Sequence, residues 1–168
     1  MDKINYDFNN RTAVITGGAQ GFGLDIAQRF LKSGAKVIIW DIDPKLIKEA
    51  KIDTNNSNLS SSIVDVSNYQ EVESEVSKIT QKSKIDILIN NAGITGPTMP
   101  LWEYDIEMWN KIVKINLLGT FNCCKAIVPN MIANNYGRIV NVASVAGKDG
   151  NANANASAYS SGKAGAIG

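Results

Sequence analysis

Tyr159 and Lys163 are the residues whose types and spacing point most directly to chemistry. They stand four positions apart at the start of an apolar helical pattern, so both side chains fall on one face of the predicted helix. A free tyrosine ionises at about pH 10, and making it a base near neutral pH takes roughly 4 kcal/mol of phenolate stabilisation. An ammonium group about 4 Å away supplies about 4 kcal/mol at an effective dielectric constant of about 20. The pair can therefore give a proton to an oxygen atom, or take one from it.

The second cluster is a glycine-rich turn at residues 16–23, between a β-branched run and a helical pattern. Its glycines have the spacing G-x-x-x-G-x-G, and backbone without Cβ atoms lets a phosphate approach the free N–H groups at a helix N-terminus. We therefore expect the turn to hold the pyrophosphate of a dinucleotide. The expected contacts are Gly17, Gln20, Gly21, Phe22 and Gly23. Nicotinamide-dependent oxidoreduction needs both this turn and a proton-moving pair.

Asp41 ends the second predicted strand, and its carboxylate could accept hydrogen bonds from an adenosine ribose. A 2′-phosphate in that place would meet a negative charge. No Arg or Lys occupies positions 18–20 or 42, from which a cation would restore NADP binding. NAD is therefore favoured over NADP, with Lys45 as the residue that leaves NADP open. The alternative interpretation of Asp41 is an exposed aspartate at a strand end.

The chain alternates short apolar runs with helical patterns. Five strands are predicted, at residues 12–16, 36–40, 61–64, 85–89 and 138–143. Helices are predicted at 22–33, 44–50, after a capping box of Ser67 and Gln70, and over 107–134 with a possible bend at Pro129. This alternation indicates a parallel sheet covered on both faces, an α/β doubly wound fold.

The composition excludes several classes of function. The chain of 168 residues has 44% hydrophobic residues and a net charge of +1, which suits one domain and favours neither nucleic acid nor a membrane surface as partner. It has no histidine, which removes Ser-His-Asp triads and most zinc sites, so no metal is expected. No export signal or bilayer-spanning stretch is evident, and a cytoplasmic protein is expected.

Some conspicuous side chains are interpreted as packing residues. Cys123 and Cys124 are adjacent, where a disulfide would be strained, and are expected to be reduced. Trp102, Trp109 and Phe121 have spacings that favour the core over a role in ligand binding. The stretch 53–62 is rich in Asn and Ser, and is expected to be an exposed loop leading into the third strand.

Several motifs occur together in a fixed order from about residue 11 to the end. They are the turn at 16–23, Asp65, Asn90-Asn91-Ala92-Gly93, Asn116, Ser144 and Tyr159-Ser-Ser-Gly-Lys163. In this order they resemble a classical short-chain dehydrogenase/reductase. The resemblance implies a Rossmann fold, NAD(P) as cofactor and a small-molecule alcohol or carbonyl substrate.

The resemblance also implies roles for individual residues. Tyr159 would be the general acid/base, and Lys163 would in addition bind the nicotinamide ribose. Ser144 would hydrogen-bond the substrate oxygen, and Asn116 would hold a water molecule that relays protons from Lys163. The remaining implied cofactor contacts are Asp65 and Val66 at adenine, and Asn91, Ala92 and Gly93 along the fourth strand, where Asn90 and Asn91 would mainly brace backbone.

The chain departs from the family pattern in two places. Fourteen residues separate Ser144 from Tyr159, more than is usual, and the excess lies in an Asn-Ala repeat at 151–156, which is expected to form a loop beside the site. A longer loop there would reshape the substrate pocket or displace Ser144. The chain also ends at Gly168, so residues 1–168 are interpreted as a C-terminally incomplete NAD(P)-binding domain without further strands and a substrate-covering segment. The full-length form is expected to be a homodimer or homotetramer.

Two functions are compatible with these observations. The first is an NAD-dependent oxidoreductase that interconverts a secondary alcohol and a ketone, with a sugar acid, a polyol or a 3-oxoacyl thioester as substrate. The alternative is a non-catalytic nucleotide-binding or interaction module formed by a shortened chain. Binding of NADH without turnover would separate the second from the first.

Overall fold

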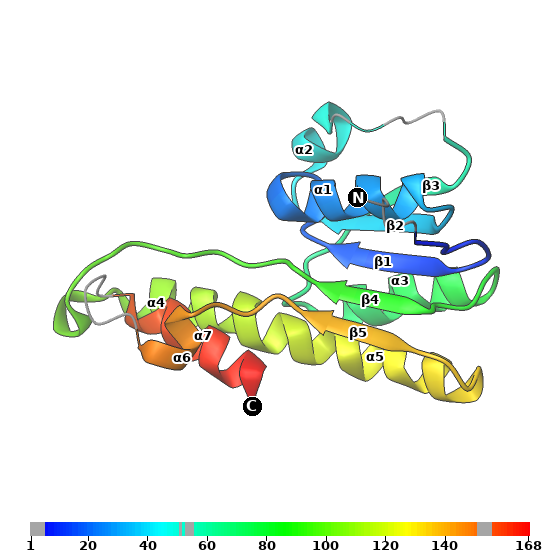
Figure 1. Cartoon of the computed structure of the whole chain (residues 1–168). Coiled ribbons are helices and arrows are strands. Elements are labelled where there is room, and N and C mark those ends of the chain that lie inside the picture. The colour runs from blue at the N-terminus through cyan, green and yellow to red at the C-terminus, as the bar shows by residue number, and fades with distance from the viewer. Residues whose placement is uncertain (1–5, 51, 53–55, 151–155) are drawn as a thin grey trace, which may run out of the picture.

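The computed structural model describes residues 6–50, 52, 56–150 and 156–168, and within them one parallel sheet forms the centre of the molecule (Figure 1). Its strands lie in the order β3-β2-β1-β4-β5, so the chain changes direction across the sheet between β1 and β4. The strands are β1 Thr12–Thr16, β2 Lys36–Asp41, β3 Leu59–Ile63, β4 Ile87–Asn90 and β5 Arg138–Asn141. The predicted doubly wound fold is confirmed.

Helices cover both faces of the sheet, as Figure 1 shows. One face carries α1 Gly21–Lys32 and α2 Pro44–Glu49, and the other carries α3 Tyr69–Thr80 and α5 Gly119–Ala133. Three more helices lie beyond the carboxyl ends of β4 and β5: α4 Ile106–Val113, α6 Ala146–Asp149 and α7 Ser157–Ile167. A 3-10 turn, Leu101–Glu103, precedes α4.

Alternate side chains of each strand reach opposite faces, which explains the continuous apolar runs. In β1, Ala13 and Ile15 pack under α1, whereas Val14 joins the cluster under α3 and α5. The predicted third strand is displaced: it runs over Leu59–Ile63 rather than 61–64. It is one of the two edge strands, and there the polar Ser60 and Ser61 can remain at the surface while their backbone pairs with β2.

The start of α3 differs from the prediction by one residue. Its N-cap is Asn68, not Ser67, and the Asn68 Oδ1 accepts hydrogen bonds from the N–H groups of Gln70 and Glu71. The Glu71 carboxylate supports this start, because it accepts from Asn68 Nδ2 at 2.9 Å and from the Asp65 N–H at 3.0 Å. The predicted capping box is not formed, because the Asn68 N–H donates to the Asp65 carbonyl instead. Asparagine caps helices at least as well as serine.

The long helix predicted at 107–134 is divided by a π-helical turn, Lys114–Leu118, between α4 and α5. Pro129 lies inside α5 without ending it. By length and hydropathy alone, the combined segment Ile106–Ala133 could cross a bilayer. Cys123, Ile127 and Met131 nevertheless pack in the core against the sheet, so this segment has the contacts of a core helix.

The interpretation of the conspicuous side chains is partly wrong. Trp102 is 85% exposed and Phe121 is 56% exposed, so neither is a core residue, whereas Trp109 packs against the cluster of Tyr104, Ile112 and Ala158. Cys123 is buried and free, and burial raises the pKa of its thiol to about 12. Both tryptophans lie around α4, where helical spacing alone does not tell which face meets the core.

The amino ends of β1, β4 and β5 are tied together by Asp86, which is 1% exposed. Its Oδ1 accepts from Arg11 Nη1 at 2.9 Å, and its Oδ2 accepts from the Thr12 N–H at 2.9 Å. Its own carbonyl accepts from the N–H of Arg138, the first residue of β5. Arg11 also lies over the Tyr136 ring at 3.7 Å. One buried carboxylate therefore fixes the end of the sheet opposite to the strand carboxyl ends.

We expect Asp86→Ala to lower the free energy of unfolding by about 3 kcal/mol, because it leaves the partly buried Arg11 side chain and the buried Thr12 N–H without their acceptor. Urea unfolding measures the loss. The matched control is Asp25→Ala, which breaks the exposed Arg29–Asp25 pair within α1 and should change stability by less than about 0.5 kcal/mol. Equal losses in the two variants would contradict the importance of Asp86.

Candidate active site

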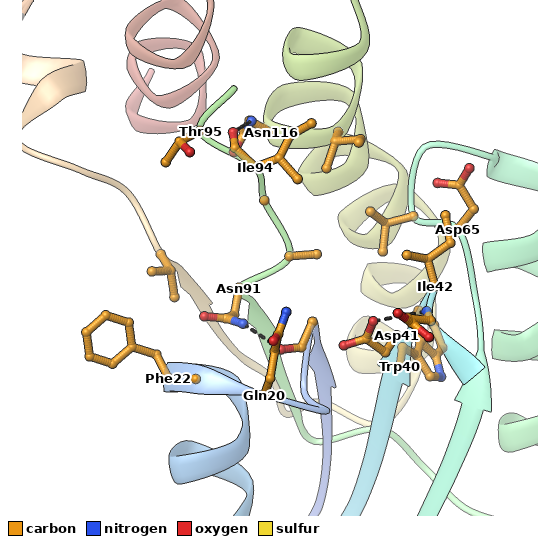
Figure 2. Close-up of a pocket in the computed structure, with 18 of the residues that line it drawn as sticks. Gln20, Phe22, Trp40, Asp41, Ile42, Asp65, Asn91, Ile94, Thr95 and Asn116 are labelled. Carbon is orange, nitrogen blue, oxygen red and sulfur yellow. Dashed lines mark hydrogen bonds between the residues drawn. The ribbon is translucent and has the colours of Figure 1, made fainter. Parts of the chain in front are cut away.

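A cleft of about 600 Å³ lies at the carboxyl ends of the strands (Figure 2). Its lining brings the two sequence clusters together. Gly17 and Gly21 line one part of it, and Tyr159 and Lys163 line another. The order of the sheet reverses between β1 and β4, and open parallel sheets bind ligands at such a reversal. Residues that are more than a hundred positions apart in the chain therefore share one cavity.

The glycine turn is shaped by close backbone contacts. A Cβ at Gly23 would lie 2.2 Å from the Gly17 carbonyl oxygen, and a Cβ at Gly17 would lie 2.9 Å from the Ala92 Cα. Gly23 itself lies beneath the turn and does not line the cleft, unlike the other predicted turn residues. Gly21 has φ of +53° and no atom within 4 Å of the place of a Cβ, so the backbone there is open to a ligand.

The N-terminus of α1 faces this opening with its N–H groups available. Gln20 is the N-cap, makes no side-chain cap, and no acidic residue stands in the first turn. A helix of twelve residues with an uncapped N-terminus favours an anion. The open backbone at Gly21 and this helix end fit the pyrophosphate of a dinucleotide.

Asn91 fastens the turn to β4. Its Nδ2 donates to the carbonyl oxygens of Thr16 and Gly17, each at 3.0 Å. The Thr16 Oγ1 accepts in return from the N–H groups of Asn91 and Ala92, each at 3.0 Å. Asn90 braces the next strand pair, because its Nδ2 donates to Asn141 Oδ1 at 2.9 Å. Asn91 thus holds backbone and also lines the cleft, whereas the Asn90 Nδ2 contacts two side chains, Asn141 Oδ1 and Cys124 Sγ, rather than the expected backbone.

Acidic and apolar side chains form another end of the cleft, where Figure 2 shows Trp40, Asp41, Ile42 and Asp65 together. Asp41 is 8% exposed, and its carboxylate accepts from the N–H groups of Ala19 and Asp43, each at 3.2 Å. The Asp65 Oδ1 accepts from the Ser67 N–H at 2.8 Å. Both carboxylates are held by backbone and keep further lone pairs for a ligand.

Lys163 is 5% exposed, and its Nζ donates to the Val142 carbonyl oxygen at 2.6 Å. No ion pair to Lys163 occurs among the described residues, and burial lowers the pKa of its ammonium group. The Nζ lies 5.9 Å from the centre of the Tyr159 ring. A cation is thus held beside the phenol ring in a poorly hydrated place.

Asn116 is buried in the π-helical turn, and such turns are frequent at functional sites. Its Nδ2 donates to the carbonyl oxygens of Ile94 and Ile112 at 2.8 and 2.9 Å. Within the described part of the chain its Oδ1 has no partner. A Cβ at Gly93 would lie 2.5 Å from that oxygen and 3.5 Å from Lys163 Nζ, so the glycine keeps a space that both polar groups face. An unpaired buried acceptor there is a place for a water molecule or a ligand.

Ser144 is the predicted catalytic residue that the structure does not bring into the cleft. The preceding residues Val142 and Ala143 line the cavity, whereas the Ser144 Oγ accepts from the Ala146 N–H at 3.2 Å just before α6. The Asn-Ala repeat expected to form a loop lies largely outside the described residues, at 151–155.

Several lining residues were not identified from the sequence: Trp40, Ile42, Asp43, Leu46, Val64, Ile94, Thr95, Ile115, Val142 and Ala143. Most of them stand at or just after the end of a strand. Because all strands are parallel, these ends meet at one edge of the sheet. Position after a strand, rather than residue type, was the signal that could have found them.

Comparisons with known proteins agree with this geometry. The family model described as short chain dehydrogenase matches residues 11–168. A 2-dehydro-3-deoxy-L-rhamnonate dehydrogenase (NAD(+)) of Sphingomonas sp. (strain SKA58) is 41% identical over 162 residues, which are 96% of this chain and 64% of the relative. A 3-oxoacyl-[acyl-carrier-protein] reductase FabG of Chlamydia muridarum (strain MoPn / Nigg) is 36% identical over 163 residues, which are 95% of this chain and 64% of the relative.

Among solved structures, NAD+-bound xylitol dehydrogenase superposes with a TM-score of 0.88 at 31% identity, over 95% of this chain and 62% of that one. The chain thus spans a little under two thirds of the length of these relatives. The family model covers nearly all of the chain, and the solved relative shares its fold. The chain therefore belongs to the short-chain dehydrogenase family.

Proposed function

We propose that the protein is an NAD-dependent oxidoreductase that interconverts a secondary alcohol and a ketone. The observation that carries the proposal is the single cleft that joins the uncapped N-terminus of α1 to Tyr159 and Lys163. A dinucleotide could extend along this cleft from Asp41 to Lys163, with its pyrophosphate at the glycine turn. The nicotinamide ring, when bound, supplies the hydride acceptor or donor.

Tyr159 is the proposed general acid and base. In the direction of reduction its O–H gives a proton to the carbonyl oxygen, and in the direction of oxidation its oxygen takes the proton of the alcohol. Lys163 stabilises the phenolate, and its attraction is screened less than that of a surface lysine because its ammonium group is buried. Asn116 is proposed to accept a hydrogen bond from a water molecule that relays protons from Lys163.

Ser144 keeps a proposed role as a donor to the substrate oxygen. Its Oγ uses a lone pair to accept from the Ala146 N–H, so the O–H remains free to donate. Ser144 does not line the cleft, and this observation favours the second candidate, a nucleotide-binding module without catalysis. NADH binding combined with no turnover on a panel of ketones would support that second candidate.

NAD rather than NADP is proposed as the cofactor. Asp41 would repel a 2′-phosphate, and the exposed Ile42 beside it offers no cation. Lys45, the remaining cation nearby, lies 4.0 Å from Glu49 within α2 and its backbone N–H serves the helix cap. The printed names of two relatives, one an NAD(+) dehydrogenase and one an NAD+-bound structure, support the same choice.

The substrate class, assembly and location are part of the same proposal. A sugar acid, a polyol or a 3-oxoacyl thioester matches the names of the relatives. The exposed apolar side chains Leu118 and Phe121, near the start of α5, support assembly as a homodimer or homotetramer. The free thiols of Cys123 and Cys124 fit a reducing compartment such as the cytoplasm.

Tyr159→Phe should reduce kcat by roughly 10²- to 10⁴-fold and leave the Kd of NADH unchanged, because only the proton-transferring oxygen is removed. Steady-state kinetics and NADH fluorescence titration measure the two quantities. Tyr136→Phe is the control, since that ring lies at the opposite end of the sheet against Arg11. Turnover by Tyr159→Phe within twofold of the unchanged protein would refute the assigned role.

Lys163→Met should show that the buried charge is kept at the expense of stability. Because burial lowers its pKa, the charged lysine destabilises the fold below the lowered pKa, and this effect disappears as the pH rises to the ordinary value of 10.5. The stability of Lys163→Met relative to the unchanged protein should therefore be higher at about pH 7 than at about pH 10. Urea unfolding at both pH values tests this, with Lys48→Met, which removes an exposed lysine, as the control. A difference for Lys163→Met that is independent of pH would be the contrary result.

Asp41→Asn should weaken NAD binding and narrow the preference for NAD over NADP by roughly 10- to 100-fold, because a charged acceptor for the ribose hydroxyls is lost. The ratio of the two kcat/KM values measures the preference. Asp25→Asn is the control, since that exposed carboxylate on α1 pairs with Arg29 and does not line the cleft. A preference unchanged by Asp41→Asn would show that Asp41 does not select the cofactor.

A further inference from the structure

Asn122 is a buried amide on α5, and it has no role in the function proposed above. It is 7% exposed, and its Nδ2 donates at 2.9 Å to the carbonyl oxygen of Val66, which is 56 positions away in the chain. Its neighbours on α5, Cys123 and Ile127, belong to the hydrophobic core on this side of the sheet. Burying an amide among such residues is unfavourable unless it makes this kind of hydrogen bond.

The partner of Asn122 belongs to the wall of the cleft. Val66 and Asp65 line the cavity next to Asp41, and Figure 2 shows Asp65 with Asp41 and Ile42, away from Asn116. Other contacts hold the residues around Val66: the Val64 N–H donates to the Asp41 carbonyl, and the Asp65 N–H donates to Glu71. Those contacts come from β2 and α3.

The contact from α5 is made at Val66 itself. Gly119 stands one turn before Asn122, and a Cβ on it would lie 2.8 Å from the Val66 Cγ2. The helix therefore approaches Val66 as closely as a glycine allows, and Asn122 fixes the carbonyl of the same residue. Between them, these two positions determine where the Val66 side chain stands in the cleft.

We propose that Asn122 is a positioning residue for the adenosine half of the dinucleotide, which it serves by holding Val66 at the wall of the cleft. The inference rests on the proposed function, because it takes the Asp41 end of the cleft as the place of the adenosine. Asn122 touches no ligand in this account and acts only through Val66.

The same helix contains a control for a purely structural role. Asn130, two turns after Asn122, accepts a hydrogen bond from the Ile85 N–H at 3.0 Å through its Oδ1. Ile85 precedes β4 at the opposite edge of the sheet, away from the cleft. Both asparagines therefore join α5 to backbone, and only one of them joins it to a residue that lines the cavity.

The experiment compares Asn122→Leu with Asn130→Leu in the purified protein. Calorimetric titration with ADP-ribose reports the adenosine half, titration with reduced nicotinamide mononucleotide reports the other half, and urea unfolding reports stability. Asn122→Leu should weaken ADP-ribose binding roughly tenfold, because the freed Val66 carbonyl loses its buried partner, and leave the mononucleotide unaffected. Asn130→Leu should lower stability and leave both affinities unchanged.

Unchanged ADP-ribose affinity in Asn122→Leu, or an equal loss for both ligands or in both variants, would overturn the inference. If Asn122→Leu does not fold, Gly119→Ala takes its place, because the added methyl group displaces Val66 without touching Asn122. Gly119→Ala should also weaken ADP-ribose binding and leave mononucleotide binding unaffected. Unchanged ADP-ribose affinity in Gly119→Ala would also overturn the inference. The unchanged protein is titrated first. Failure of that protein to bind ADP-ribose at all would refute the proposed function, and the inference with it.

Discussion

The close approach of the backbone after β1 to the backbone after β4 is the constraint on which the rest of the site depends. A Cβ at Gly17 would lie 2.9 Å from the Ala92 Cα, and a Cβ at Gly23 would lie 2.6 Å from the Asn91 Nδ2. Thr16 and Asn91 hold the two segments in that position with hydrogen bonds from both sides. The N-terminus of α1 is thereby brought to the edge of the sheet where the other strands also end.

A second constraint is the burial of a cation that has no acidic partner among the described residues. Lys163 is held by the Val142 carbonyl, a neutral acceptor, just after the end of β5. A carboxylate beside Lys163 would neutralise the field that Tyr159 feels. The stability needed to tolerate this charge is supplied elsewhere, by the two apolar layers and by Asp86 at the opposite edge of the sheet.

The sequence predicts the strands and the glycine turn well because their signals are local. A run such as Ala13-Val14-Ile15 is apolar on both faces wherever a parallel strand is buried. Predictions fail where tertiary contacts decide. Asn68 rather than Ser67 caps α3, because Glu71 reaches both Asn68 and the Asp65 backbone. Trp102 has an apolar side chain and yet lies at the surface, which no spacing rule reveals.

Within the cleft, some lining residues could be predicted from the sequence and others could not. Lys163 was predicted from its spacing to Tyr159 and Asn116 from the family resemblance, and both line the cleft. Ile94 and Thr95 have no such mark, and they line the cleft because the chain passes it after the end of β4. Ser144 shows the converse limit, since its type suggests catalysis whereas its Oγ accepts from the Ala146 N–H and it does not line the cleft.

The π-helical turn at Lys114–Leu118 has a consequence for how the two halves of the long helix face their neighbours. A π-turn holds one residue more than an α-helical turn, which rotates everything after it by about 100° relative to an uninterrupted helix. With this offset, α4 packs on α7 while α5 packs on α3 and β4. Removing one residue would restore an unbroken helix, but its two halves could not then both meet their present partners. The extra residue thus rotates the face of α5 that meets α3 and β4 relative to the face of α4 that meets α7, the helix that carries Tyr159.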